Sequence, residues 1–329
     1  MGTGTKSLAD LGLTAQGGRD AAVTGLSVDS RTVKDGHLFA ALPGAKAHGG
    51  DFIGYALRMG AGSVLTDRKG AEIARAALAE SHAALVVTED PRQALAFAAA
   101  LWFGKQPETV VAVTGTNGKT SVANFTRQIW TELGLQAASI GTTGVEGAFT
   151  APSPHTTPEP VTLHRLLSDM AAAGVTHAAM EASSHGLDQR RIDGVRLAAA
   201  GFTNFTQDHL DYHATFEAYF DAKAGLFARV LPDDGIAVIN MHDRRGSDMA
   251  EIARARGQSV LMVGHAAEDD LRVLGQRFDA TGQDLRFAWK GTAHMARLHL
   301  IGGFQASNVL VAAGLAIAAG EDAEAVFAV

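Results

Sequence analysis

The sequence contains no cysteine, which excludes disulfide bonds and thiolate metal sites. It also lacks a long hydrophobic run, because its longest apolar stretches, Ala94–Phe103 and Val309–Ala319, fall well short of the roughly 20 residues that span a bilayer. Residues 1–6 lack the apolar core of a secretory signal. The net charge is -7, and Lys and Arg do not cluster as a nucleic-acid surface requires. We therefore expect a soluble cytoplasmic protein, acting as a monomer on small molecules.

The length of 329 residues predicts two domains. Short β-rich runs alternate with helical segments in the first hundred residues, which predicts a small α/β domain over residues 1–105. Pro91 suits the first turn of a helix that runs to about Phe103, and residues 104–107 indicate the boundary between the two domains. The second domain, residues 106–329, opens with Thr109–Thr114, a β-branched run typical of parallel strands buried on both faces.

Later runs indicate a doubly wound, mostly parallel α/β sheet in the second domain. Near the end, three runs separated by Thr281-Gly282 and Lys290-Gly291 predict an antiparallel hairpin extension. A last helix is predicted from Ala323, and because it stops without a cap, the chain looks cut. Further strands are predicted at His177–Glu181, Ala198–Asn204, Gly235–Asn240 and Ser259–Val263.

A glycine loop follows the strand Thr109–Thr114 and precedes a helix predicted from about Ser121 to Leu133. In this setting, glycines allow backbone N–H groups to face phosphates, Lys119 reaches the terminal phosphates, and the Thr120 hydroxyl can hold Mg²⁺. A simple turn is the alternative, but the Lys-Thr pair favours a phosphate loop. The candidate ATP-binding residues here are Gly115, Thr116, Asn117, Gly118, Lys119, Thr120 and Ser121.

Glu181 ends an apolar run, so we expect it at the carboxyl edge of the sheet as a magnesium ligand. The loop 204–213 contains several ionisable groups, including His209, and serves either as a metal site or as capping structure. Lys223 lies on an apolar stripe of the helix predicted at 215–230, which predicts partial burial. Burial would lower its pKa and allow reaction with CO₂; alternatively, its stem follows the stripe and its ammonium reaches water.

Three segments, 115–120, 180–187 and 204–213, resemble signatures of the Mur ligase family, in particular its MurE type, in the right order. The resemblance implies an ATP-dependent ligase of bacterial peptidoglycan synthesis. Such a ligase phosphorylates the D-Glu carboxylate of UDP-MurNAc-L-Ala-D-Glu, and the amine of a diamino acid, meso-diaminopimelate or L-lysine, then attacks the acyl phosphate. Lys119 would stabilise the transferring phosphate. Thr120 and Glu181 would bind one Mg²⁺, and Glu181, His209 and a carbamylated Lys223 would serve a second.

The resemblance also implies two groups of substrate contacts. Asn308 matches a family asparagine near the nucleotide base, whereas Gln305 stands where a second asparagine is expected. For the uridine and diphosphate contacts, which are given next, the alternative is that these residues simply form a turn. Uridine and diphosphate would bind Val28, Ser30, Ala45, Lys46 and Ala47, and the muramoyl peptide would bind His155, Thr156, Thr157, Ser183, Gln189 and Arg191.

The family has a third, carboxyl-terminal domain, which we expect to be absent here. We therefore predict a chain that binds the UDP-substrate but ligates poorly or not at all. The alternatives are a folylpolyglutamate synthetase, the Mur ligase acting one step later, a non-ligating nucleotide-binding module, and an unrelated P-loop kinase or GTPase. The unrelated kinase or GTPase predicts no affinity for the UDP-sugar, and ligand binding separates these classes.

Overall fold

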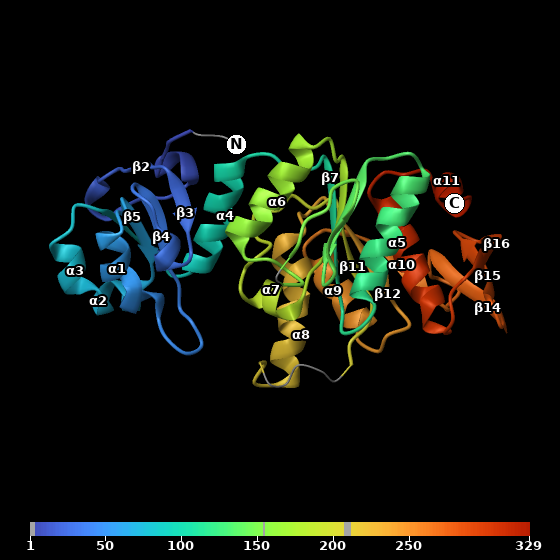
Figure 1. Cartoon of the computed structure of the whole chain (residues 1–329). Coiled ribbons are helices and arrows are strands. Elements are labelled where there is room, and N and C mark those ends of the chain that lie inside the picture. The colour runs from blue at the N-terminus through green and yellow to red at the C-terminus, as the bar shows by residue number, and fades with distance from the viewer. Residues whose placement is uncertain (1–3, 154, 207–211) are drawn as a thin grey trace. The chain divides into compact units, whose positions relative to one another are not determined.

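Two main β-sheets organise the chain, one in each of two units (Figure 1). The computed structural model describes residues 4–153, 155–206 and 212–329. None of the helices in these ranges has the length and apolar character that crossing a membrane requires. The first unit comprises Met1–Gln106, Glu159–Ser168 and Gln189–Gly194, and the second comprises Pro107–Pro158, Asp169–Asp188 and Val195–Val329.

The main sheet of the first unit has four parallel strands in the order β3-β4-β5-β6. Alternate residues of β4 enter two separate cores, because successive side chains of a strand point to opposite faces. Leu38 and Ala40 belong to one core, and Phe39 and Ala41 belong to the other. The strands are β3 (Gly25–Ser27), β4 (His37–Ala41), β5 (Ser63–Thr66) and β6 (Ala84–Val87), and a separate pair is formed by β1 (Lys6–Ser7) and β2 (Ala22–Val23).

Local signals set the helix ends in this unit. Asp90 caps the helix α4 through Gln93 N (3.0 Å), Pro91 is its first residue, and the chain leaves it at Gly104, as predicted. Asp67 caps α2 through Gly70 N (2.7 Å), and the helical stretch breaks at Ala74 before α3 begins. The helices are α1 (Ile53–Arg58), α2 (Arg68–Ile73), α3 (Arg75–Ala79) and α4 (Pro91–Phe103), with 3₁₀ turns η1 (Ala9–Leu11), η2 (Gln16–Gly18), η3 (Ser30–Thr32) and η4 (Gly49–Phe52).

The sheet of the second unit has ten strands in the order β16-β15-β14-β13-β12-β11-β7-β10-β8-β9. Strands β8, β10, β7, β11, β12, β13 and β14 run parallel, which confirms the predicted fold class. The strands are β7 (Thr109–Thr114), β8 (Ala137–Gly141), β9 (Gly144–Gly147), β10 (His177–Glu181), β11 (Ala199–Phe202), β12 (Ile236–Asn240), β13 (Ser259–Gly264), β14 (Leu271–Asp279), β15 (Gly282–Trp289) and β16 (Thr292–Leu298).

The antiparallel extension β14-β15-β16 is also confirmed. Lys290 and Gly291, at the turn between β15 and β16, both have positive φ (46° and 91°), as a tight two-residue hairpin turn requires. The hairpin β8-β9 was not predicted.

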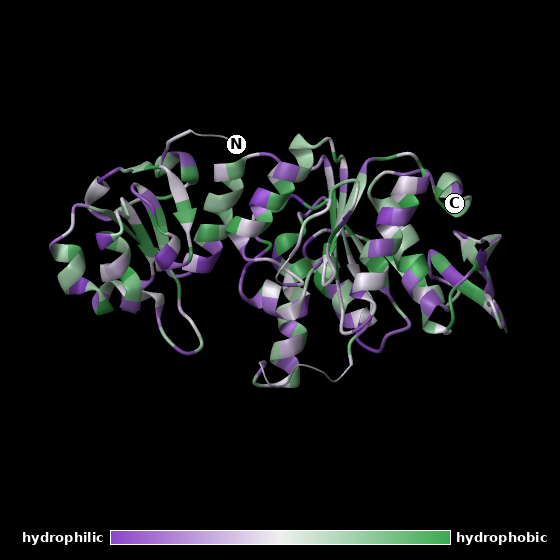
Figure 2. Ribbon diagram, in the orientation of Figure 1, coloured by the Kyte–Doolittle hydropathy of each residue, from purple (hydrophilic) through white to green (hydrophobic). Residues whose placement is uncertain are grey.

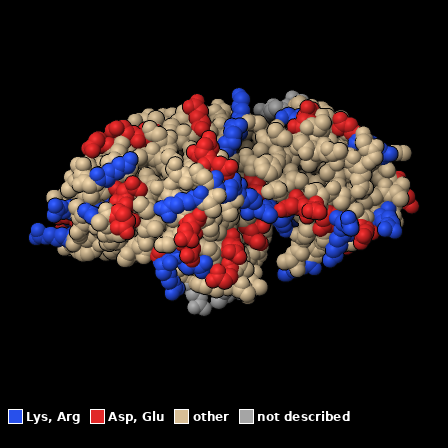
Figure 3. All heavy atoms as spheres, turned by 180° about the vertical axis from the view of Figure 1, so that it is seen from behind, with Lys and Arg blue, Asp and Glu red and all other residues tan. Residues whose placement is uncertain are grey.

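Helices pack on the sheet of the second unit through an apolar core. Val122 and Trp130 of α5, Leu310 and Val311 of α10, and Val113 of β7 all lie in that core. Figure 2 shows hydrophobic residues concentrated on the strands, whereas Figure 3 shows basic and acidic side chains interspersed on one face of the surface. The helices of this unit are α5 (Lys119–Glu132), α7 (Ser184–Asp188), α8 (Phe216–Gly225), the π-helix η5 (Leu226–Val230), α9 (Gly246–Ala255), α10 (Phe304–Ala318) and α11 (Ala323–Phe327). Most of α6 (Pro160–Ala172), up to Ser168, belongs to the first unit.

Candidate active site

The glycine loop between β7 and α5 can be built only with glycine at two positions. Gly115 has φ 152°, and a Cβ there would lie 1.9 Å from Thr203 Oγ1. Gly118 has φ 86°, and a Cβ there would lie 2.5 Å from Asn308 Oδ1. Helix α5 begins at Lys119, two residues earlier than predicted. The loop therefore meets the helix amino terminus directly, where backbone N–H groups favour an anion.

Two lysines converge on this loop. Lys119 Nζ donates to the carbonyl oxygens of Gly115 (2.9 Å) and Thr116 (2.8 Å), and Lys223 Nζ donates to the same Gly115 oxygen (2.7 Å). Lys223 is 1% exposed, so it is fully buried instead of partly buried. Its ammonium lies 4.4 Å from the ring centre of Tyr219 and does not extend along the surface to water. The two lysines bring positive charge to one point, which suits a phosphate-binding pocket.

Glu181 is held at the carboxyl end of β10 by donors from two neighbouring segments. Its Oε1 accepts from Thr120 Oγ1 (2.9 Å) and from Thr142 N (2.8 Å). A Cβ at Gly141 would lie 2.1 Å from the same oxygen, so glycine leaves the room that the carboxylate occupies. Thr120 and Glu181, two predicted magnesium ligands, are therefore in direct contact. A hydroxyl beside a carboxylate is a donor set that Mg²⁺ accepts.

Three predicted substrate contacts lie near Glu181. Thr157 Oγ1 donates to the backbone carbonyl oxygen of Glu181 (2.9 Å) and accepts from Ser183 N (3.0 Å). Thr156 Oγ1 and Thr142 Oγ1 lie 3.0 Å apart. Ser183 Oγ accepts from Gly186 N (3.0 Å) and so caps the short helix α7. Thr157 is buried and ties two segments together, whereas Thr156 and Ser183 face the pocket described next.

These groups line one polar pocket with a volume of about 280 Å³. His209 lies outside the described residues. Within the described ranges, no three His, Cys, Asp or Glu side chains cluster as a ready-made metal site. The pocket therefore combines two ammonium groups with one carboxylate, which fits a phosphate chain accompanied by a divalent cation. Its lining is Thr116, Asn117, Gly118, Lys119, Thr120, Thr142, Thr156, Glu181, Ser183, Ser184, His185 and Lys223.

A second pocket, of about 600 Å³, adjoins the first, and Asn117 and Gly118 line both. Asn308 is buried there, and its Nδ2 donates to Gln305 Oε1 (3.2 Å). Phe304 is 68% exposed. This pocket offers a nucleotide base two kinds of contact. They are polar amide side chains and the rings of Phe304 and His242. The remaining lining is Ser121, Asn204, Thr206, Asn240, Asp243 and Ser307.

The first unit has its own pocket, of about 660 Å³, which Val28, Ser30 and Ala47 line. Arg31 and Asp29, also at this pocket, form a bidentate ion pair, in which Nε lies 3.0 Å from Oδ1. The side chain and backbone N–H of Arg31 lower the pKa of the Asp29 carboxyl to about 2. Phe52 and Tyr55 add exposed aromatic rings.

Six of the predicted contacts do not line any of these three pockets, and the buried Thr157 is one of them. His155 is exposed, and its carbonyl accepts from Ser153 Oγ (2.7 Å). Arg191 donates to Gln189 Oε1 (2.9 Å), so these two side chains hold each other within the first unit. Ala45 and Lys46 are exposed, in the loop between Pro43 and His48, which bridge each other.

The sequence interpretation missed several residues of the site. Gly141 is the last residue of β8 and Thr142 follows it. The small residues of β8 gave a weak strand signal, although Gly-Thr at the end of an apolar run is itself a pattern for a strand end. Phe304 and His242 gave no local signal, because only tertiary structure brings β12 and α10 to the glycine loop.

Family comparisons agree with this geometry. The model of the Mur ligase middle domain matches residues 113–316, and that of the Mur ligase family catalytic domain matches residues 22–102. The chain belongs to the Mur ligase family. Mur ligases use ATP and Mg²⁺.

Individual Mur ligases are similar over nearly all of this chain. It is 49% identical over 326 residues to the UDP-N-acetylmuramoyl-L-alanyl-D-glutamate–2,6-diaminopimelate ligase of Caulobacter vibrioides, covering 97% of this chain and 65% of the relative. The ligase of the same name from Mesorhizobium japonicum is 49% identical over 306 residues, covering 92% and 61%. A solved structure with that name superposes with a TM-score of 0.84 at 29% identity, covering 99% of this chain and 66% of that one. The chain thus spans somewhat less than two thirds of the length of these curated relatives.

Proposed function

We propose that this chain carries the substrate-binding and phosphoryl-transfer parts of a MurE-type ligase, which adds a diamino acid to UDP-MurNAc-L-Ala-D-Glu at the expense of ATP. One observation carries the proposal: the glycine loop, Lys119, Lys223 and the Thr120–Glu181 pair line the same pocket. The glycine loop and Lys119 suit a phosphate chain, and the Thr120–Glu181 pair suits its accompanying cation.

The chemistry proceeds in two steps. A carboxylate oxygen of D-Glu attacks the γ-phosphorus of ATP, the bond to the β-γ bridging oxygen breaks, and ADP leaves an acyl phosphate. The amine of the diamino acid then attacks the acyl carbon, and inorganic phosphate departs with the loss of a proton from nitrogen. Mg²⁺, when bound by Thr120 and Glu181, supplies charge neutralisation of the phosphates. Lys119, at the start of α5, places its ammonium beside the transferring phosphoryl group.

Lys223 is proposed to be carbamylated. A neutral lysine amine adds to CO₂ and releases one proton, which leaves an anionic carbamate. The support is its complete burial together with its place in the pocket lining, because desolvation favours the neutral amine. The proposed roles of His209 and Lys223 as ligands of a second Mg²⁺ stay predictions.

The pocket of the first unit is proposed to bind the uridine diphosphate end of the substrate. Val28, Ser30 and Ala47 line it, and the exposed rings of Phe52 and Tyr55 offer stacking surfaces for a base. Thr156 and Ser183 are proposed to contact the peptide end. The names of the relatives favour 2,6-diaminopimelate over L-lysine as the incoming amino acid. We propose that the protein acts in the cytoplasm as a monomer; gel filtration tests the second point.

Calorimetric titration with UDP-MurNAc-L-Ala-D-Glu tests the substrate assignment, with UDP-MurNAc-L-Ala as the matched control. We expect the dipeptide form to bind more tightly, because only it carries the D-Glu carboxylate. Equal affinities would refute the D-Glu contact, and no affinity for either compound would refute the UDP-substrate assignment. The predicted weakness of ligation is checked separately, by assaying tripeptide formation by this chain.

A further inference from the structure

The antiparallel extension β14-β15-β16 carries a hydrogen-bonded pair of glutamines, one buried and one partly buried. Gln283, on β15, is fully buried, and Gln276, on β14, lies diagonally across from it, because Gln283 pairs with Phe278 and Gln276 pairs with Leu285. Gln276 Nε2 donates to Gln283 Oε1 (2.8 Å). Burying an amide group costs free energy unless its hydrogen bonds are made. The hydrogen-bond partners of this pair therefore indicate its role.

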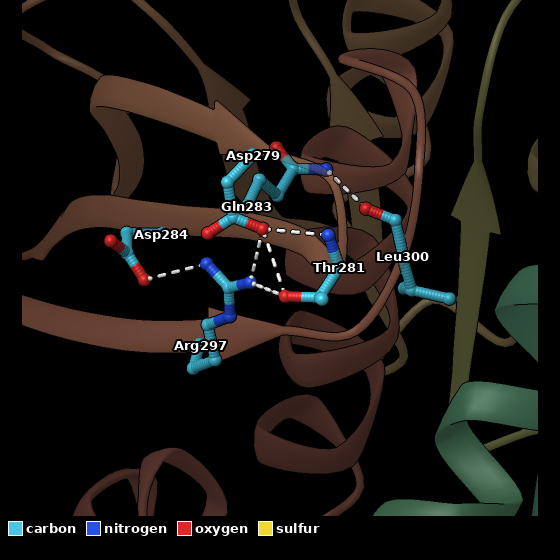
Figure 4. A network of polar contacts seen from close by, with 6 residues as sticks. All are labelled: Asp279, Thr281, Gln283, Asp284, Arg297 and Leu300. Carbon is cyan, nitrogen blue, oxygen red and sulfur yellow. Dashed lines mark hydrogen bonds and ion pairs between the residues drawn. The ribbon is translucent and has the colours of Figure 1, made fainter.

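The remaining hydrogen bonds of the pair all reach the segment between β16 and α10. Gln283 Nε2 donates to the carbonyl oxygens of Leu300 (3.4 Å) and Gly302 (3.0 Å). Gln276 Nε2 donates to the carbonyl oxygen of Gly303 (2.9 Å). Because carbonyl oxygens only accept, these contacts fix the orientation of both amide groups. Figure 4 shows Gln283 extended towards Leu300.

The segment 300–303 needs such restraint. Two consecutive glycines, Gly302 and Gly303, precede α10, and Gly302 has φ 107°. The amino terminus of α10 has no side-chain cap. Glycines are conformationally permissive, so without external contacts this entry to the helix would sample several conformations.

The first turns of α10 form one wall of the 600 Å³ pocket. Phe304, Ser307 and Asn308 line it, and Asn308 Oδ1 is the atom that excludes a side chain at Gly118. A Cβ at Gly302 would lie 2.7 Å from the ring of Phe304, so the position of that ring depends on the backbone that the glutamines hold.

We propose that the Gln276–Gln283 pair positions the nucleoside-binding wall of the ATP site. By fixing the carbonyl groups of Leu300, Gly302 and Gly303, the pair holds Phe304 and Asn308 where the base binds. The phosphate pocket is built from other segments and does not depend on the pair. This inference rests on the proposed binding of ATP, and it makes the extension a part of nucleotide recognition.

The same extension offers a matched control. Arg297, on β16, donates to Asp279 Oδ1 (2.7 Å), Asp284 Oδ1 (3.1 Å) and Thr281 Oγ1 (2.6 Å) (Figure 4). It pairs with Asp284, whereas Gln283 pairs with Leu298, so Arg297 and Gln283 point to opposite faces of the extension. Arg297→Met therefore removes polar contacts from the same strands without touching the segment 300–303.

The test compares wild type, Gln283→Met and Arg297→Met by calorimetric titration with Mg²⁺-ATP and with Mg²⁺-tripolyphosphate. Methionine keeps the volume of glutamine and removes its hydrogen bonds. We expect Gln283→Met to weaken ATP binding about five- to twentyfold, because two positioning hydrogen bonds are lost. Its tripolyphosphate affinity, and both affinities of Arg297→Met, should stay within about twofold of wild type.

Three results would overturn the inference. Gln283→Met could bind ATP with wild-type affinity, its affinities for ATP and tripolyphosphate could fall by the same factor, or its ATP affinity could equal that of Arg297→Met. Amide hydrogen exchange supplies a readout that does not need ATP: exchange at residues 300–308 should be faster in Gln283→Met and unchanged in Arg297→Met. Should the wild type bind neither ligand, the proposed function fails, and unchanged exchange in Gln283→Met would then overturn the positioning role itself.

Discussion

Replacing Gly141 by alanine tests the arrangement of the Glu181 carboxylate. The added Cβ would lie 2.1 Å from Glu181 Oε1, 2.8 Å from Cδ and 3.0 Å from Cγ. Non-bonded contacts below 3.0 Å are not tolerated, so the carboxylate has to move by about 1 Å. Gly141 does not have a positive φ, so alanine itself is compatible with the backbone and the clash is the dominant effect.

The displacement breaks two hydrogen bonds to a buried charge, from Thr120 Oγ1 (2.9 Å) and Thr142 N (2.8 Å). Hydrogen bonds to charged groups contribute about 1.5–3 kcal/mol each, and the relaxed carboxylate recovers part of that. We therefore expect Gly141→Ala to lower the free energy of unfolding by about 2–4 kcal/mol. The Mg²⁺-dependent part of the ATP affinity should fall as well, because Thr120 and Glu181 are no longer in hydrogen-bond contact.

Urea unfolding and ATP titration with and without Mg²⁺ measure the two effects. Gly275→Ala is the matched control, since Gly275 lies on β14 of the same sheet and a Cβ there meets nothing within 4 Å. A Gly141→Ala variant as stable as Gly275→Ala, with the ATP affinity of the wild type in Mg²⁺, would refute this account of the Glu181 site.

Two further predictions concern ionisable side chains, the buried Lys223 and the partly buried His177. If Lys223 is carbamylated, ¹³C NMR in the presence of ¹³C-bicarbonate should show a carbamate resonance in wild type that is absent from Lys223→Met. Identical spectra would show that the buried lysine is unmodified. Burial lowers the pKa of His177, and Glu321 and Glu108 only partly oppose this shift. The folded state therefore prefers neutral His177, so its contribution to stability is present above the unfolded pKa of about 6.5 and is lost as pH falls through the folded value. His177→Gln should show a smaller loss of unfolding free energy between about pH 7 and pH 5 than wild type, and parallel pH profiles would exclude His177 as the cause.

Local sequence patterns predicted the structure correctly where a single segment contains the whole pattern. The β-branched run Thr109–Thr114 with its glycine loop predicted β7 and the start of the phosphate pocket. Lys290-Gly291 predicted a hairpin turn, because two residues of positive φ leave few alternatives there. Glu181 was expected at the end of a strand, and it is the last residue of β10.

The remaining features depend on contacts between distant segments. Lys223 was expected to be partly buried because its helix was considered alone, whereas Tyr219 and the Gly115 carbonyl enclose its ammonium. Thr142 contacts Glu181 across 39 positions of sequence, and no local pattern specifies that distance. The ligand roles of the site residues stay predictions for the same reason, since a ligand is recognised by the assembled pocket.

The most direct test of the central claim is calorimetric titration of wild type and Lys119→Ala with Mg²⁺-ATP. Lys119 makes two hydrogen bonds within the glycine loop, at 2.9 Å and 2.8 Å, and is exposed enough to reach a bound phosphate. We predict that wild type binds ATP and that Lys119→Ala binds it at least about tenfold more weakly, with little change in unfolding temperature. Equal affinity in a folded variant would contradict the claim that this loop holds the phosphates of ATP.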